Sequence, residues 1–315
     1  MKKIVSAILV VLIAYGSLKT YLNYQITTDL NEMIADLKDY AVIEYQSVST
    51  NLLTQKIAVS DIVIQPTLTH EDIVIDEIRL LGADFFKRQD YGLKDFQLNS
   101  HKNREIQIKG LTLDLHSEFF SSPPFPFSME HNNALKQPPS LLKELGYEIL
   151  KINFSFAYDP NPKKQHWVLH FNHQQEDMFT LSSEIILTAE LPVKSDQSFS
   201  AMLYNYQTLQ LQQGFLKYQD NSLLTRYTAF KAKKEGKPLE TIQQNSFLAI
   251  LDTLSQHQIL LSEKTLQAIQ NFIHKPNTIQ FKVEPNPPLN LDKLWYLFML
   301  SPSELPEALN LEITQ

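Results

Sequence analysis

A repeated pattern of large apolar residues organises the chain between residues 57 and 154. Apolar side chains recur at positions 1, 3, 6 and 8 of eight-residue segments, with mostly polar residues between them. A spacing of two within each half of a segment is typical of a β-strand. The pattern therefore predicts strands at residues 57–64, 73–80, 91–98, 106–113 and 147–154.

The residues at the centre of each segment shift the phase of this alternation. A β-bulge, with one extra residue, would keep all four apolar side chains on one face and bend the strand. Without a bulge, the two halves of each strand would present their apolar residues to opposite sides. We favour the bulge, which predicts a large curled antiparallel sheet with an apolar concave side.

The rest of the chain predicts further strands and then helices. Alternating residues mark strands at 165–173, 179–191 and 209–218, and their short connections suit an antiparallel meander. After residue 222 the spacing becomes helical, which predicts a C-terminal cluster of about four helices packed on the sheet. The expected fold class is α+β, with an N-terminal transmembrane helix before the sheet. We expect three regions: 1–25, the anchor; 26–200, an amphipathic helix and the meander; and 201–315, an α+β lobe that shares the same sheet.

The N-terminus indicates export or membrane anchoring. Two lysines precede an unbroken apolar run at residues 4–16, and apolar character resumes after Lys19. A cleaved signal peptide with a site near Ala14-Tyr15-Gly16 is one interpretation. We favour a retained anchor, because residues 4–24 are long enough to span ~30 Å of hydrocarbon. The lysines then place the N-terminus in the cytoplasm and the body in the periplasm of a bacterial inner-membrane protein.

An amphipathic helix is predicted directly after this segment. Apolar residues from Ile26 to Ala41 fall at helical spacing, with acidic residues opposite them. The helix either packs on the sheet or lies on the membrane surface. Its polar side carries Lys38 but lacks the basic face that membrane-surface helices usually have, which favours packing on the sheet.

A segment rich in Phe and Pro interrupts the strands at residues 119–127. Its prolines exclude a central strand, yet it carries Phe119, Phe120, Phe125 and Phe127. These four side chains are candidate contacts for an apolar ligand or a protein partner. The alternative is a loop that folds back and closes one end of the sheet.

Composition excludes several classes of function. The net charge of −7 argues against nucleic acid as a partner, and the absence of Cys excludes thiolate chemistry. With 7 glycines the chain has no Gly-rich phosphate loop. His166 and His170 are four residues apart on a strand, too far to share one metal ion, and His173 faces the other side. We therefore predict no catalytic residue, cofactor or metal.

A short basic run is the remaining candidate site. Lys231, Lys233 and Lys234 stand near the end of a predicted helix. The helix dipole favours cations there, and contact with anionic lipid headgroups is the alternative.

The layout of the chain resembles the AsmA-like and YdgA-type families of bacterial envelope proteins. The resemblance is carried by the anchor, the strand pattern and the strand-to-helix junction Leu-Gln-Gln-Gly-Phe-Leu-Lys-Tyr-Gln-Asp-Asn-Ser-Leu-Leu-Thr-Arg at 211–226. The segment 289–311 is similar as well. The resemblance implies a role in envelope maintenance, with lipid handling in a β-lined groove, and it supplies no catalytic residues.

Two hypotheses follow for function. In the first, the chain is a non-enzymatic, membrane-anchored periplasmic protein whose sheet holds or shields a lipid or another apolar ligand. In the second, it is a structural or assembly factor of the envelope with a filled core, and the Phe/Pro segment docks a protein partner. An enzyme is the third and least supported interpretation.

Overall fold

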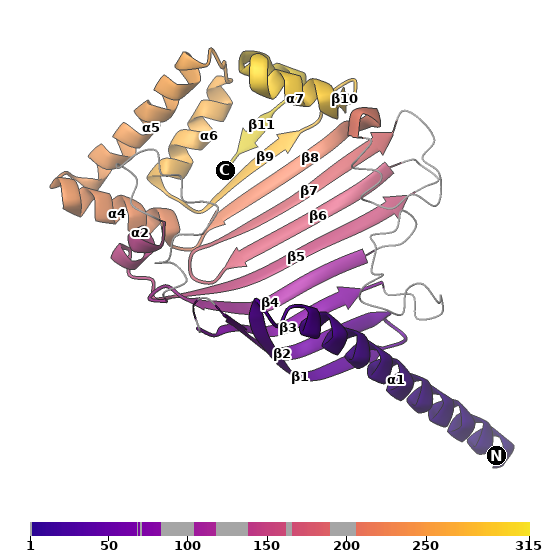
Figure 1. Ribbon diagram of the computed structural model, residues 1–315. Coiled ribbons are helices and arrows are strands. Elements are labelled where there is room, and N and C mark those ends of the chain that lie inside the picture. Colours follow the sequence, from indigo (N-terminus) through magenta and orange to yellow (C-terminus); the bar gives the residue numbers. More distant parts are fainter. Residues whose placement is uncertain are drawn as a thin grey trace.

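One open antiparallel sheet dominates the structure. The computed structural model describes residues 2–67, 69, 71–82, 104–117, 138–161, 166–189 and 206–315; the side chains of residues 2–11 are not among those described. The sheet has 11 strands in the order β1-β2-β3-β4-β5-β6-β7-β8-β9-β11, and β10 pairs with β8 (Figure 1). Each strand up to β9 lies beside its neighbour in sequence, so the predicted antiparallel meander is confirmed.

Apart from α1 and α2, strands dominate the described chain up to residue 220, and helices dominate after it. The strands are β1 Ala41–Asn51, β2 Lys56–Pro66, β3 Ile73–Leu81, β4 Arg104–Asp114, β5 Ile149–Asn161, β6 His166–Gln175, β7 Phe179–Ala189, β8 Leu209–Asp220, β9 Thr278–Val283, β10 Leu289–Asn290 and β11 Glu312–Thr314. The α-helices are α1 Lys2–Asp36, α2 Pro138–Glu144, α4 Leu223–Glu235, α5 Leu239–Gln256, α6 Glu263–His274, α7 Leu291–Leu300 and α8 Leu305–Ala308. Two 3₁₀ turns, Tyr206–Thr208 and Pro302–Glu304, complete the described elements. The α+β class is confirmed.

The eight-residue pattern determines how the first strands pair. In β2 and β3, position 1 of one segment lies opposite position 8 of the other, and position 3 lies opposite position 6. β1 follows the same rule, with Ile43, Tyr45, Val48 and Thr50 opposite the four apolar residues of β2. Side chains on opposed residues share a face and touch. Antiparallel nesting of the repeat therefore places the apolar positions of β1–β3 in continuous rows.

The phase shift is an extra residue that keeps both halves of each strand on one face. Val59 and Ile62 belong to different halves of β2, yet both are buried in one cluster with Ile75 and Ile78 of β3. Asp61 of β2 and Gly110 of β4, both at position 5, have φ of +54° and +62°. β1–β4 keep a constant mutual register, and a shift appears between β4 and β5, at Ile108/Leu111. The extra residues of β1–β4 thus lie beside one another, so the register between these strands stays constant. The register shifts where β4 pairs with β5, which has no extra residue at this point.

The predicted pattern is wrong for β5. Leu150, Ile152 and Phe154 lie opposite the apolar residues of β4, in plain alternation. Ile149, which the eight-residue pattern assigns to the apolar face, is 57% exposed. Tyr147 precedes the strand and is buried against Leu145 and Met178. The predicted segment at 91–98 lies outside the described residues, and β3 pairs directly with β4.

The helices that contact the sheet cover the same face of it. Leu22 and Ile26 of α1 are each 1% exposed and pack on Ile57 of β2. At the other edge, α6 packs on β9 and β11 through Phe272 and Ile279. α2 and α4 cover one end of the strands, α7 covers the opposite end, and α5 packs on α4 and α6 (Figure 1). The apolar face therefore has helices at its edges and ends.

α1 is one continuous helix of 35 residues, where the sequence predicts an anchor and a separate amphipathic helix. Its C-terminal half packs on the sheet, and it ends at Asp36, before the predicted limit at Ala41. Within the described residues, no helix combines the length and the apolar character that a membrane span requires. The side chains of residues 4–11, which belong to the predicted anchor, lie outside the described part of the chain, so the anchor stays a prediction.

Candidate functional site

The apolar face continues from β4 across β5–β8, where the strands alternate regularly except for one register shift between β7 and β8 at Ile186/Leu187. Phe154 lies opposite Ile108 and His173, and Phe156 lies opposite Ile106 and Phe171. On the reverse face the same strands carry mainly polar residues, including Asn153, Ser155, His170, Asn172 and Glu184. One side of the sheet is thus apolar over its whole width, and the other side is polar in this region.

None of the helices in the described part of the chain covers the centre of this apolar face. We define the central face as the side chains of Phe154, Phe171, Leu181, Ile185 and Leu216, from β5, β6, β7 and β8. Ile185 and Leu216 are 36% and 37% exposed, and the other three are half-buried. Figure 1 shows these strands in view between α1, the α2/α4/α6 group and α7. The central face is an apolar surface bounded by helices rather than a closed core.

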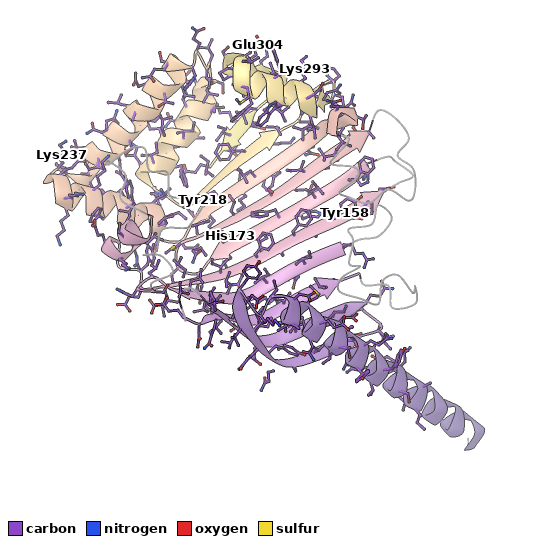
Figure 2. All side chains as sticks on the ribbon, viewed as in Figure 1. Tyr158, His173, Tyr218, Lys237, Lys293 and Glu304 are labelled. Carbon is purple, nitrogen blue, oxygen red and sulfur yellow. The ribbon has the colours of Figure 1, made fainter. Side chains whose placement is uncertain are left out.

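Aromatic rings connect the central face to its covered edge. Phe154 and Phe171 meet edge to face, with centroids 5.3 Å apart. His173 stacks on Phe179 at 5.4 Å, and Phe179 stacks on Tyr218 at 5.5 Å. Figure 2 shows the labelled Tyr158, His173 and Tyr218 spread along this side of the sheet. Such rings offer large apolar contact area at fixed positions.

Burial keeps the titratable groups of this face neutral. Desolvation lowers the pKa of His173, so its imidazole stays uncharged at neutral pH. Desolvation, followed by the nearby Asp220 carboxylate, raises the pKa of Tyr218 well above its ordinary value. The Tyr218 hydroxyl instead donates a hydrogen bond of 3.1 Å to Asp220. The face therefore presents no charge to an apolar ligand at these two positions.

Asp220 also explains how the strand-to-helix junction is built. Its carboxylate accepts hydrogen bonds from the Leu224 amide at 2.8 Å and the Thr225 hydroxyl at 3.2 Å. Ser222 precedes α4 but makes no side-chain capping bond, and its hydroxyl contacts Tyr147 and Asp177 instead. The carboxylate stabilises the helix N-terminus, which is electropositive. The junction thus fixes α4 against the end of the apolar face.

A cavity of about 580 Å³ lies at one end of the sheet, mainly on its polar side, to which Glu105, Asp159 and His170 belong. It opens where β3, β4 and β5 end, and its lining includes Arg104, Glu105, Tyr158, Asp159 and His170. Arg104 is 2% exposed and donates a hydrogen bond to the Gly82 carbonyl. Tyr158 lies on the apolar face, opposite Arg104 in the sheet. Because Arg104 and Tyr158 are both buried, the open lining of the cavity comes mainly from the polar side of the sheet.

Of the predicted site residues, the three lysines belong to α4 and not to the strands of this face. Phe119, Phe120, Phe125 and Phe127 lie outside the described residues, so neither the ligand contact nor the partner contact predicted for them is assessed. Lys231 pairs with Glu235 at 3.9 Å, and the Lys234 ammonium lies 5.6 Å from the Phe230 ring centre.

The positions of Lys231, Lys233 and Lys234 give little support to contact with lipid headgroups. A membrane that contained the predicted anchor would lie at the N-terminus of α1. The neighbouring Lys237, labelled in Figure 2, lies at the end of the molecule far from the N-terminus of α1. All of these lysines belong to or follow the last turns of α4, where the dipole favours cations.

The histidines lie as the strand geometry predicts. His170 faces the polar side and lies 3.4 Å from Glu184, whereas His173 stacks on the apolar side. Within the ranges that the structure describes, no three His, Asp or Glu side chains gather closely enough to hold a metal ion.

The sequence did not single out the central face. Its residues alternate plainly in β5–β8 and carry no rare motif, so they resemble any half-buried strand face. The signal that was available is the long run of apolar positions on four successive strands with few helices between them.

Comparison with known proteins identifies similar chains without a stated function. A family model described as "Uncharacterized protein" matches residues 172–315, from β6 to the C-terminus. A protein of Aquifex aeolicus, also described as an uncharacterized protein, is 22% identical over 246 residues. That similarity covers 72% of this chain and 82% of the Aquifex chain.

Proposed function

We propose that this protein is a non-enzymatic, membrane-anchored protein of the bacterial envelope that holds an apolar ligand, such as a lipid acyl chain, on the central face. The observation that carries the proposal is that Ile185 and Leu216 stay more than a third exposed in the middle of a continuous apolar surface. Apolar surface exposed to water costs about 25 cal/mol of free energy per Å². A bound apolar ligand that covered these side chains would recover that free energy. A shallow apolar surface between helices is also a common setting for ligand sites.

The shape of the site suits an elongated apolar ligand. The central face crosses four strands, and opposed residues there are about 5 Å apart. An acyl chain would lie across the rings of Phe154 and Phe171.

The anchoring part of the proposal is supported by α1. Its N-terminal half projects beyond the sheet in Figure 1, and Leu12 and Ile13 there are each 60% exposed. An apolar helix without protein contacts suits a bilayer better than water. The N-terminal lysines orient it with the sheet in the periplasm.

Uptake of a fluorescent fatty acid tests the ligand site. Full-length protein in mild detergent should bind the probe, and Ile185→Glu/Leu216→Glu should lower its affinity at least about tenfold, because a carboxylate on the face repels an acyl chain. Leu260→Glu is the matched control, since Leu260 is 85% exposed in the loop between α5 and α6 and its substitution should leave binding unchanged.

The same preparation gives a second measurement. Native mass spectrometry of the wild type should show a co-purified lipid whose occupancy falls in the double variant. The proposal fails if wild type and double variant bind the probe equally, or if the wild type carries no lipid and takes up no probe.

A further inference from the structure

Helix α7 exposes far more apolar surface than its contacts with the sheet require. Its last seven residues, 294–300, are all apolar: Leu-Trp-Tyr-Leu-Phe-Met-Leu. A helix that is apolar on every side is normally surrounded by protein or lipid. Here Leu297 is buried, and Leu291 and Leu294 pack against the cluster around Trp167 and Leu211. One side of α7 is thus covered.

The remaining sides form a contiguous exposed surface. We define the α7 patch as Trp295, Tyr296, Phe298, Met299 and Leu300, which are 62%, 55%, 61%, 58% and 69% exposed. The ring centres of Trp295 and Phe298 lie 6.2 Å apart, so these two rings are neighbours on the helix surface. Side chains of this kind offer ~150–250 Å² each, so the patch presents roughly 500 Å². That is at the upper end of the largest apolar patch on an ordinary monomer, and more than half of one side of a standard protein interface.

The composition of the patch suits a protein partner. Aromatic residues and Met are enriched in the cores of protein interfaces, and Trp and Tyr are the residues that most often dominate binding energy. The five side chains stand on a helix that is fixed to the sheet through three leucines, so the surface is already in place before binding.

The charges around the patch narrow the choice of partner. Between residues 289 and 311 the chain carries Asp292, Glu304 and Glu307 against the single cation Lys293, and all four side chains are exposed. Figure 2 shows Lys293 and Glu304 at this end of the molecule. A net acidic rim disfavours an anionic lipid surface, which attracts Lys and Arg clusters. It also disfavours a second copy of the same surface, because a two-fold contact would bring like charges together.

The position of α7 points away from the proposed membrane. α7 lies over β8 and β10, near the edge of the sheet opposite β1 and α1. In Figure 1 the N-terminus of α1 lies beyond the β1 edge of the sheet, and α7 lies at the opposite edge. A partner bound to α7 would therefore lie at the edge of the sheet farthest from α1, beside one end of the central face.

We propose that the α7 patch is the docking surface for a different protein, one that offers an apolar socket with a basic rim. Trp295 and Phe298 would fill the socket, and Glu304 and Glu307 would pair with the rim. This inference does not depend on whether the central face binds a lipid.

Photocrosslinking in cells of the native host tests the proposal. With p-benzoylphenylalanine in place of Phe298, the full chain should form an adduct of one discrete mass with a different protein. Glu304→Lys/Glu307→Lys should reduce that adduct on the order of tenfold, because it replaces the acidic rim with a basic one. Glu240→Lys/Asp252→Lys on α5, also exposed, is the matched control and should leave the adduct in place.

Several results would overturn the inference. An adduct between two copies of the chain would make the patch a dimer interface, and adducts with lipid alone would make it a membrane contact. A protein adduct that survives the reversal at Glu304 and Glu307, or no adduct at all, would also contradict it. Unchanged melting of the charge variants confirms that their fold is intact, and probe uptake in the same variants reports separately on the central face.

Discussion

Single residues at the middle of the eight-residue segments allow the first strands to carry an extra residue. Asp61 and Gly110 both adopt left-handed backbone at position 5. Gly has no Cβ to clash in this region, and Asp is among the residues that tolerate it best. The Gly110 amide donates a hydrogen bond of 2.9 Å to the Asn153 side chain, which satisfies a donor that the ladder leaves free at this point.

Gly110 should be the least replaceable of these positions. A Cβ there would overlap the Asp76 side chain on β3, in addition to the left-handed φ of +62°. Gly110→Ala should lower the free energy of unfolding by about 2–4 kcal/mol, from backbone strain and the displaced carboxylate. Denaturant unfolding of the full chain in detergent measures this.

Gly236→Ala provides the control for Gly110→Ala. Gly236 has φ of +64° at the end of α4 and nothing within 4 Å of a Cβ, so its cost should be about 1–2 kcal/mol from strain alone. Equal losses in the two variants would show that the contact between β3 and β4 at Asp76 is not close.

At the scale of elements, α1 combines two roles that the sequence separates. Residues 4–24 and 26–41 have different apolar patterns, which suggested two helices. No Pro or Gly interrupts the chain between them, and Asn23 and Asn31 accept hydrogen bonds from Thr50 and Tyr45 of β1, which hold the continuous helix to the sheet. The pattern reports which side of a helix is apolar, but it does not report where the helix meets its partner.

The docking of α1 gives a direct prediction. Ile26→Ala should destabilise the contact of α1 with β1 and β2 by about 2–5 kcal/mol, because Ile26 is 1% exposed against Ile57. Amide hydrogen exchange in β1 should accelerate. Tyr24→Ala, at a position 71% exposed on the same helix, should change exchange little. Similar exchange in both variants would mean that α1 is not held by this contact.

Some strands could be predicted from the sequence more readily than others. β2, β3 and β4 follow from the eight-residue pattern, because two apolar pairs around a polar centre are distinctive. β1 follows the same pattern, but Thr50 replaces a large apolar residue at position 8 and Gln46 stands at the centre, so the signal was missed. In β5, adjacent Ile149 and Leu150 fit two phases, and only the pairing with β4 shows that Leu150 faces inward.

At the scale of the whole molecule, the sheet has one apolar side whose edges and ends are covered by helices. The strand pattern predicts a shared apolar side, because each strand carries its own inward residues. It does not predict which part of that side stays uncovered, since helices from distant parts of the chain decide this. Ile185 and Leu216 are therefore distinguished by their exposure and not by their sequence context. The same holds for the α7 patch. Its apolar residues would be equally typical of a buried helix, so only their exposure distinguishes them.

Photoaffinity labelling with a diazirine-bearing fatty acid tests the central claim most directly. The full-length protein should be labelled on peptides from β5–β8 that contain Phe154, Phe171, Ile185 or Leu216, and excess unlabelled fatty acid should suppress the label. Labelling confined to α1 or α7, labelling on the polar side of the sheet, or no competed label at all would contradict the account.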